Sequence, residues 1–272
     1  TPHLNPPPQG GRRAGRNIMI PLIKVKALKF SYNGTPAVAG ADFELLEKDL
    51  LAVVGPNGSG KSTLLRLISG FLEPSGGAAE LLGREVRSYP KAELARLVAY
   101  VPSELYMPYE FSVFEIVLMG RSPHVAWWRN YSDADAARVL EVLAQVGIAD
   151  LRDRSINSLS SGERQLAFIA QALAQDPKVL LLDEPTSHLD INYKMQIFEL
   201  LTRLASAGGL GVMVVSHDLA LLSAYAGKAL MLKKGGQLFY GPAAEGLSGA
   251  NIAAAYGISD PASVASLIGG RC

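Results

Sequence analysis

Apolar side chains alternate with polar ones near the start of the chain and form continuous runs later. Between residues 23 and 32, and again around Phe43 and Leu45, apolar residues occupy about every second position, which predicts an antiparallel pair of strands. Later short runs predict further strands at residues 50–54, 79–82, 98–101, 179–182 and 211–215, with a final strand pair near 229–232 and 237–240. Continuously apolar strands separated by helices predict an α/β fold whose mostly parallel sheet is covered on both faces.

Helical periodicity appears between these runs. We expect helices at 63–68, after Asp190 and from about Asp218, together with a helical insert near 104–165. Residues 112–115 and 132–135 both resemble N-terminal capping sequences. The second of these opens an amphipathic helix that ends at Gly147, and its predicted apolar stripe is Val139, Leu140, Leu143 and Val146.

Composition limits the function classes. The 272 residues are 49% hydrophobic with a net charge of +1, enough for one substantial core and without the basic stripe expected for nucleic-acid binding. Cys272 is the only cysteine, and no apolar run approaches the roughly 18 residues of a membrane span. We therefore expect an unexported protein with no nucleic-acid partner and no intramolecular disulfide.

The chain divides into three parts. Residues 1–18, rich in Pro, Gly and Arg, predict a flexible tail that could include an expression tag. Residues 19–248 form the expected nucleotide-binding unit, and residues 249–272 form a C-terminal extension.

A phosphate-binding pattern follows the run at 50–54. The segment fits G-x-x-x-x-G-K-[ST] and precedes a predicted helix, and its residues are Gly55, Pro56, Asn57, Gly58, Ser59, Gly60, Lys61, Ser62 and Thr63. In such a loop the backbone N–H groups converge on phosphate, Lys61 adds a positive charge over the β and γ oxygens, and the Ser62 hydroxyl binds Mg²⁺. The alternative is a Gly-rich turn between a strand and a helix.

Two carboxylates end the run at 179–182. Ligands of open α/β sheets collect at the carboxyl ends of strands, so we expect Asp183 to support Mg²⁺ and Glu184 to act as a general base. A strand end or a helix cap would account for one acid but not easily for two.

Ser160 and Glu163 fit the capping box S-x-x-E at the start of another helix. Capping alone explains these two residues. It does not require Gly162, which leaves the positive end of the helix open to an anion.

In this order, the phosphate loop, Leu159-Ser160-Ser161-Gly162-Glu163, the strand ending in Asp-Glu, residues 187–190 and His217 resemble the nucleotide-binding subunit of ATP-binding cassette (ABC) transporters. The resemblance covers nearly all of residues 20–250. It implies a P-loop ATPase core with an N-terminal antiparallel β subdomain and a helical subdomain, binding ATP and Mg²⁺.

The resemblance also implies a head-to-tail homodimer in which each ATP lies between two chains. Tyr32 would stack on adenine, and His217 would contact the γ-phosphate. The segment Ser160, Ser161, Gly162 and Glu163 would face the ATP of the partner chain, with Ser160 and Gly162 on its γ-phosphate, and Asp190 would link the two sites. Two simpler alternatives stay open: Tyr32 as an ordinary strand aromatic, and His217 as a strand-end residue next to a cap formed by Ser216 or Asp218.

Two positions depart from the family pattern. Ser103 stands where the family usually has a Gln that contacts Mg²⁺, and its shorter side chain needs a bridging water. Ser161 replaces a commoner Gly. Both departures concern turnover and coupling more than nucleotide binding.

Residues 117–124 and 186–191 resemble the ATPase subunits of importers for ferric siderophores, haem and cobalamin. This resemblance implies a peripheral subunit on the cytoplasmic face of the cell membrane, docked to a transmembrane permease. An external (periplasmic or extracellular) binding protein would bring the transported compound to that permease. Trp127 and Trp128 would anchor the permease or, alternatively, pack within the insert. Two other functions remain as alternatives: a soluble ABC ATPase for DNA repair or cluster assembly, and a slow nucleotide switch.

Overall fold

A computed structural model describes residues 20–104, 107–234, 236–261 and 264; the expected tail (1–18) and most of 262–272 lie outside them. The strands are β1 (Ile23–Tyr32), β2 (Thr35–Leu45), β3 (Leu50–Val54), β4 (Gly76–Leu81), β5 (Arg84–Glu85), β6 (Val98–Val101), β7 (Val179–Asp183), β8 (Gly211–Val215), β9 (Lys228–Lys233) and β10 (Gly236–Pro242). The helices are α1 (Lys61–Ile68), α2 (Lys91–Leu97), α3 (Val113–Met119), α4 (Asp133–Val146), α5 (Ser161–Leu173), α6 (Ile191–Ser206), α7 (Leu219–Tyr225), α8 (Ala243–Gly246) and α9 (Gly249–Tyr256). Short 3-10 turns η1 (Val86–Ser88), η2 (Ser122–His124), η3 (Ala149–Leu151) and η4 (Ile156–Ser158) connect some of them.

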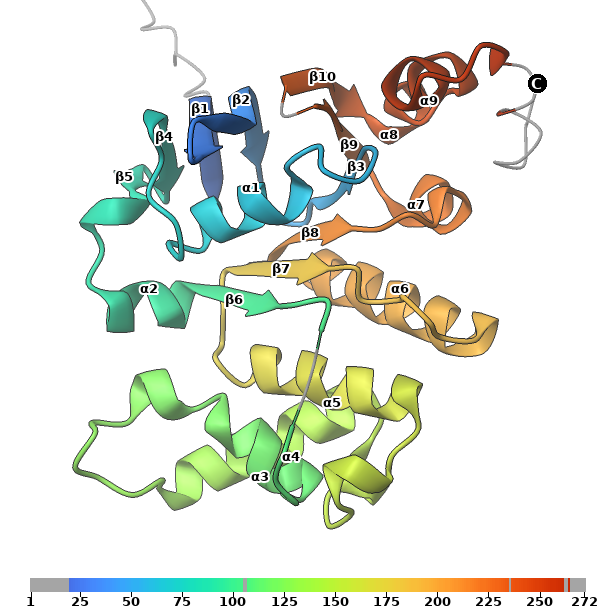
Figure 1. The fold of residues 1–272 in the computed structure, drawn as a ribbon. Helices are drawn as coiled ribbons and strands as arrows, with labels where there is room; N and C mark the ends of the chain where they lie inside the picture. Colours follow the sequence, from blue (N-terminus) through green and yellow to red (C-terminus); the bar gives the residue numbers. More distant parts are fainter. Residues whose placement is uncertain (1–19, 105–106, 235, 262–263, 265–272) are drawn as a thin grey trace, which may run out of the picture.

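The larger sheet has the strand order β10-β9-β3-β8-β7-β6 (Figure 1). Neighbouring strands from β9 to β6 are parallel, and only β10 is antiparallel. Because side chains alternate along a strand, Leu51 and Val53 of β3 join one core with α1, while Ala52 and Val54 join another with α5 and α6. Both faces are buried, which confirms the prediction made from the continuous apolar runs.

The smaller sheet is antiparallel and has the order β2-β1-β4-β5. It confirms the strand pair predicted from alternation, and the run near 79–82 supplies its third strand. Buried residues of β1, β2 and β4 share one hydrophobic core with α1, and this core fixes the α1 helix between the two sheets.

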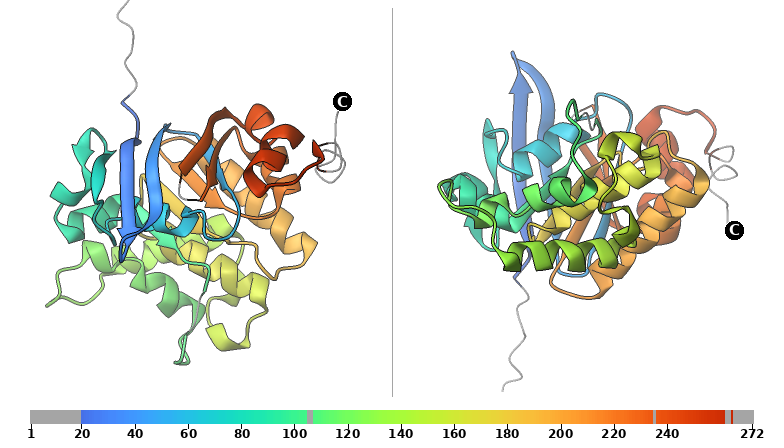
Figure 2. Two further views of the ribbon diagram at one scale, coloured as in Figure 1. Left: turned by 45° about the horizontal axis from the view of Figure 1, so that its top comes forward. Right: turned by 90° about the horizontal axis from the view of Figure 1, so that it is seen from below.

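Helices α3, α4 and α5 follow β6 in sequence and lie together beyond that edge of the sheet (Figures 1 and 2). Ser112, Ser132 and Ser160 each begin one of these helices in a complete capping box, as the sequence predicts. One position in the α4 stripe is wrong, since Leu140 is 43% exposed and Val142 is buried instead. At 100° per residue, Val139, Val142, Leu143 and Val146 share a face that excludes Leu140.

At the other end of the larger sheet, α8 and α9 pack against β9. Ile252, Ala253 and Ala255 of α9 are buried, so part of the expected C-terminal extension contributes to the main core. No helix in the described part of the chain is both long enough and apolar enough to cross a bilayer.

Candidate active site

Three neighbouring strands bring the predicted motifs to one edge of the sheet. β3, β8 and β7 are adjacent and parallel, so their carboxyl ends lie side by side. Residues 55–62 follow β3, Ser216 and His217 follow β8, and Glu184 follows β7. This shared edge is where an open α/β sheet binds its ligands.

Glycine is required at two positions of the phosphate loop. Gly55 has a φ angle of +150°, and a Cβ atom on it would lie 2.2 Å from the Leu232 oxygen. Gly60 has a φ angle of +95°, and a Cβ atom on it would lie 2.1 Å from the Ala37 oxygen. Gly60 precedes α1 in the left-handed conformation, and α1 receives no side-chain cap. The first N–H groups of α1 are therefore open to an anion.

The Lys61 ammonium is held by this loop. It donates to the carbonyl oxygens of Gly55 at 2.7 Å and Pro56 at 3.1 Å, and the residue is buried. Burial lowers the pKa of Lys61, while the charges of Glu184 and Asp183 act in the opposite direction. A phosphate would add the negative charge that this buried cation lacks.

Other loop residues are placed as a phosphate site requires. Ser62 and Thr63 lie half-buried in the first turn of α1, whereas Asn57 and Gly58 are exposed. Ser59 is buried, and its hydroxyl oxygen has no hydrogen-bond partner among the described residues.

The Asp183 carboxylate is 2% exposed and only half satisfied. Its Oδ2 accepts a hydrogen bond from the Tyr100 hydroxyl at 3.2 Å, but Oδ1 has no partner among the described residues. Burial, followed by the charge of Asp183, raises the pKa of Tyr100, so the phenol stays a donor. A buried carboxylate oxygen without a partner fits a bound divalent cation. The described residues contain no cluster of three or more His, Cys, Asp or Glu that could hold a metal ion.

Glu184 is held from two sides. Its Oε1 lies 2.9 Å from His217 Nε2, and its Oε2 accepts a hydrogen bond from the Ser187 hydroxyl at 3.0 Å. The Glu184 backbone is left-handed, with φ +54°, and its N–H donates to the Val215 oxygen at 2.9 Å. The carboxylate is thus fixed at the sheet edge, next to the imidazole.

His217 is not the cap of the following helix. Asp218 caps α7 by accepting from the Leu221 N–H, and Ser216 accepts from the Asp218 N–H. Asp218 thus forms the cap next to His217, as the simpler alternative predicts, and the His217 ring, 43% exposed, also contacts Glu184.

Ser160 and Glu163 form the predicted capping box at the start of α5. Glu163 Oε2 accepts from both the N–H and the hydroxyl of Ser160 at 2.8 Å, and these bonds lower the pKa of Glu163. Gly162 is explained by packing. A Cβ atom there would lie 2.2 Å from Cγ of Tyr193, because that ring covers the first turn of α5.

Residues 38–187 match the model of the ABC transporter family, which spans more than half of the chain. The chain belongs to the ABC transporter family. It is accordingly an ATP-binding protein and an ATPase.

Known ABC proteins resemble this chain over most of its length. A hemin import ATP-binding protein of Streptomyces coelicolor is 38% identical, over 82% of this chain and 79% of that protein. A cobalamin import ATP-binding protein of Halobacterium salinarum is 37% identical over 78% of this chain and 53% of that protein, so the chain spans about half of that relative. A solved structure described as an inward-facing metal-chelate type ABC transporter is 33% identical, with a TM-score of 0.77, over 86% of this chain and 88% of that chain.

The remaining ABC residues occupy separate positions. Tyr32 ends β1 and is 44% exposed, with its ring 4.8 Å from Phe30 in an edge-to-face pair. Asp190 caps α6 by accepting from the Tyr193 N–H at 3.0 Å. Ser103, just beyond β6, and Ser161, the first residue of α5, are exposed. The predicted roles of all four residues in ATP binding stay predictions.

Tyr256 was missed by the sequence analysis. A cavity of about 510 Å³ is bordered by Glu184 and His217 on one side and by Ile252 and Tyr256 of the C-terminal segment on the other. Burial raises the pKa of the Tyr256 phenol, and the Gly55 N–H, which lies toward the hydroxyl, acts in the opposite direction. No local motif signals this contact, because a C-terminal helix reaches the phosphate loop only through the fold.

Proposed function

We propose that this ABC ATPase powers an importer that takes up a metal chelate of ferric siderophore, haem or cobalamin type through a separate permease. The Glu184 carboxylate, fixed beside His217 at the edge that holds the phosphate loop, carries the ATPase assignment. The hemin and cobalamin import relatives and the metal-chelate transporter structure support the import direction and the substrate class.

Glu184 is the proposed general base. With one oxygen next to His217 and the other bonded to Ser187, its carboxylate has a fixed direction, which favours removal of a proton from a water that attacks the γ-phosphate. Lys61 would exchange two carbonyl acceptors for phosphate oxygens. Ser62 and Asp183 would hold Mg²⁺, which supplies positive charge against the phosphate oxygens.

The other half of each pocket is proposed to come from a second copy. Ser160, Ser161, Gly162 and Glu163 would face the ATP of the partner chain, and Asp190 would connect the two pockets. Ser160 supports this role because it combines a hydroxyl with the positive end of the α5 helix dipole. Since that hydroxyl is bonded to Glu163, it must turn from the carboxylate to donate to a phosphate.

The proposed location is peripheral, on the cytoplasmic face of the membrane, with an external binding protein delivering the chelate to the permease. Trp127 and Trp128 support a permease contact. Their side chains are 91% and 67% exposed, and their rings pair edge to face at 5.5 Å. The alternative that they pack within the insert is wrong, and two exposed indoles side by side are typical of an interface anchor.

The hemin and cobalamin import relatives favour the import proposal over a soluble ABC ATPase. The rate of ATP hydrolysis by the parent protein distinguishes the ATPase from a slow nucleotide switch. A switch would hydrolyse so little ATP that replacing the general base would hardly lower the rate.

Glu184→Gln tests the proposed base. We expect this variant to bind ATP and to accumulate as a dimer on size exclusion, with hydrolysis reduced about a hundredfold or more, since the amide cannot accept the proton. Glu199→Gln, on the exposed side of α6, is the matched control and should hydrolyse at the parent rate. Equal turnover by Glu184→Gln and the parent would contradict the proposed mechanism.

A further inference from the structure

The end of α3 packs closely on α5. A Cβ atom at Gly120 would lie 2.1 Å from the Gln171 oxygen and 3.0 Å from the Ala174 Cβ, so only glycine allows this approach. Residues 120–124, part of the segment that resembles metal-chelate importer ATPases, therefore lie against the carboxyl end of α5. The ATPase mechanism above does not explain why these residues are there.

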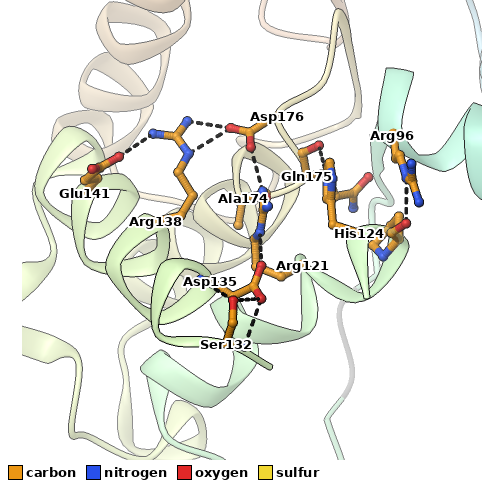
Figure 3. Close-up of polar contacts among 11 residues, drawn as sticks. Arg96, Arg121, His124, Ser132, Asp135, Arg138, Glu141, Ala174, Gln175 and Asp176 are labelled. Atoms are coloured by element: carbon orange, nitrogen blue, oxygen red, sulfur yellow. Dashed lines mark hydrogen bonds and ion pairs between the residues drawn. The ribbon is translucent and has the colours of Figure 1, made fainter. Parts of the chain in front are cut away.

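The Arg121 guanidinium lies at this contact between the end of α3 and α5 (Figure 3). Nε donates to Asp135 Oδ1 at 3.0 Å, and Nη1 donates to the Ala174 oxygen at 2.8 Å and to Asp176 Oδ2 at 2.5 Å. The Arg121 side chain is only 12% exposed. One buried cation thus joins the start of α4 to the end of α5 and to the turn before β7.

Neighbouring contacts close the same junction. The His124 ring lies 2.9 Å from the Gln175 oxygen, and the Pro123 oxygen accepts from Arg96 Nε of α2 at 2.7 Å (Figure 3). Arg138 Nε of α4 donates to Oδ1 of Asp176 at 2.8 Å, the carboxylate oxygen that Arg121 does not contact. The backbone between α5 and β7 is therefore held from the α3–η2 segment and from α4, and the η2 segment is itself bonded to α2.

This connection joins the two halves of the catalytic machinery. α5 begins at the Ser160 cap, and β7 ends at Asp183, which Glu184 follows. The turn between them, residues 174–178, sets the direction of one element relative to the other. An ion pair that is largely shielded from solvent often adds little stability over apolar packing, and in some proteins it selects one arrangement among several.

We propose that Arg121 is a positioning residue for ATP hydrolysis, which fixes the orientation of α5 relative to β7 and thereby presents Ser160 to the ATP of a second chain. The inference rests on the proposed dimer. It assigns to Arg121 a role in dimer closure and none in the binding of ATP by its own chain, since the phosphate loop lies on other elements.

Arg121→Met in the Glu184→Gln background tests this role, because Met keeps the length of the side chain and removes its charge and donors. We expect the ATP-promoted dimer to have a dissociation constant raised about tenfold, as a lost coupling of 1.4 kcal/mol would give. The affinity of the monomer for an ATP analogue should stay within about twofold. Arg121→Lys, which keeps the charge but not the three-way geometry, should restore part of the dimer affinity.

The control is Arg152→Met, another arginine near the insert helices, whose side chain pairs only with the adjacent, exposed Asp153 among the contacts described. It should dimerise like the parent. A dimer constant for Arg121→Met within twofold of the parent, or an equal change in Arg152→Met, overturns the inference.

A second variant decides the matter if Arg121→Met fails to fold. Asp176→Asn removes one partner at a half-exposed position and should raise the dimer constant about threefold, and an unchanged constant overturns the inference. Failure of Glu184→Gln itself to dimerise is a different result, which contradicts the proposed function and the inference built on it.

Discussion

At the residue scale, Tyr256 of the C-terminal helix α9 places its hydroxyl near the Gly55 N–H of the phosphate loop. Tyr256→Phe removes this hydroxyl but keeps the ring among its apolar neighbours. The loss of this polar interaction, about 1 kcal/mol, should loosen the loop and raise KM for ATP about fivefold. Steady-state kinetics on the purified chain measures this change.

Tyr240→Phe is the matched control for that experiment. It also removes a phenol bonded to the backbone, here to the Glu44 oxygen, but at the edge of the sheet formed by β10. Both variants should melt at similar temperatures, and only Tyr256→Phe should change KM. An equal KM in the two variants would contradict a role for Tyr256 in the loop.

The positions of site residues could be predicted from the sequence only where a local motif marks them, and their roles stay predictions. Gly55, Lys61 and Asp183 belong to short patterns whose neighbours in sequence are their neighbours in space. Gly162 appeared to keep a helix end open, yet its Cβ position is filled by the Tyr193 ring from another helix. Tyr256 carries no motif at all. Both depend on contacts between elements, which no local pattern encodes.

At the element scale, the start of α1 differs from the starts of α3, α4 and α5. The latter three are closed by capping boxes, whereas α1 follows a glycine with no side-chain cap. A capping side chain occupies the N–H groups that a phosphate would need. Among these four helices, α1 is therefore the one whose free N–H groups fit the phosphates of a nucleotide bound to its own chain.

The cap of α4 makes a prediction about acid stability. Hydrogen bonds from Ser132, and then the Arg121 guanidinium, lower the pKa of Asp135 to about 2. Because the folded pKa is below the unfolded value, the carboxylate contributes about 2 kcal/mol of stability near neutral pH. This contribution is fully present above the unfolded pKa and is lost as the pH falls toward 2.

Asp135→Asn should remove this pH-dependent stability. Urea unfolding at pH 7 should show a deficit of about 2 kcal/mol in the variant, and the deficit should shrink as both proteins are taken below pH 4. Asp133→Asn, at the exposed first residue of α4, should cost less at pH 7. A deficit in Asp135→Asn that stays constant from pH 7 to pH 3 would be inconsistent with the cap as its source.

Most elements could be predicted because their apolar periods are simple. Strands such as β3 and β7 are short, wholly apolar and buried on both faces, and α4 begins at its predicted cap. The pattern could not show that the strand near 79–82 pairs with β1, since pairing partners are chosen by the fold. Leu140 shows the same limit for a helix, where a shift of one position moved a residue out of the buried stripe.

At the scale of the whole molecule, α5 and the end of β7 carry residues of the two proposed half-sites of one chain. The turn that joins them, residues 174–178, is held by Arg121 and Arg138. Ser160 and Glu163 are bonded to each other at the start of α5, while Lys61 is held by its own loop at the start of α1. Each chain is thus expected to offer one phosphate loop and one α5 terminus to a partner. Activity per chain should then rise with protein concentration until the dimer is saturated.

Complementation tests this division directly. Lys61→Ala removes the phosphate loop's cation, and Ser160→Asp keeps a good N-cap while placing a negative charge before the partner's phosphate. Each variant alone should be inactive as a dimer. In an equal mixture, half of the dimers join the two variants and hold one intact pocket, so about a quarter of the parent activity should return. A mixture as inactive as its components, together with parent turnover that does not depend on protein concentration, would mean that one chain holds a complete site.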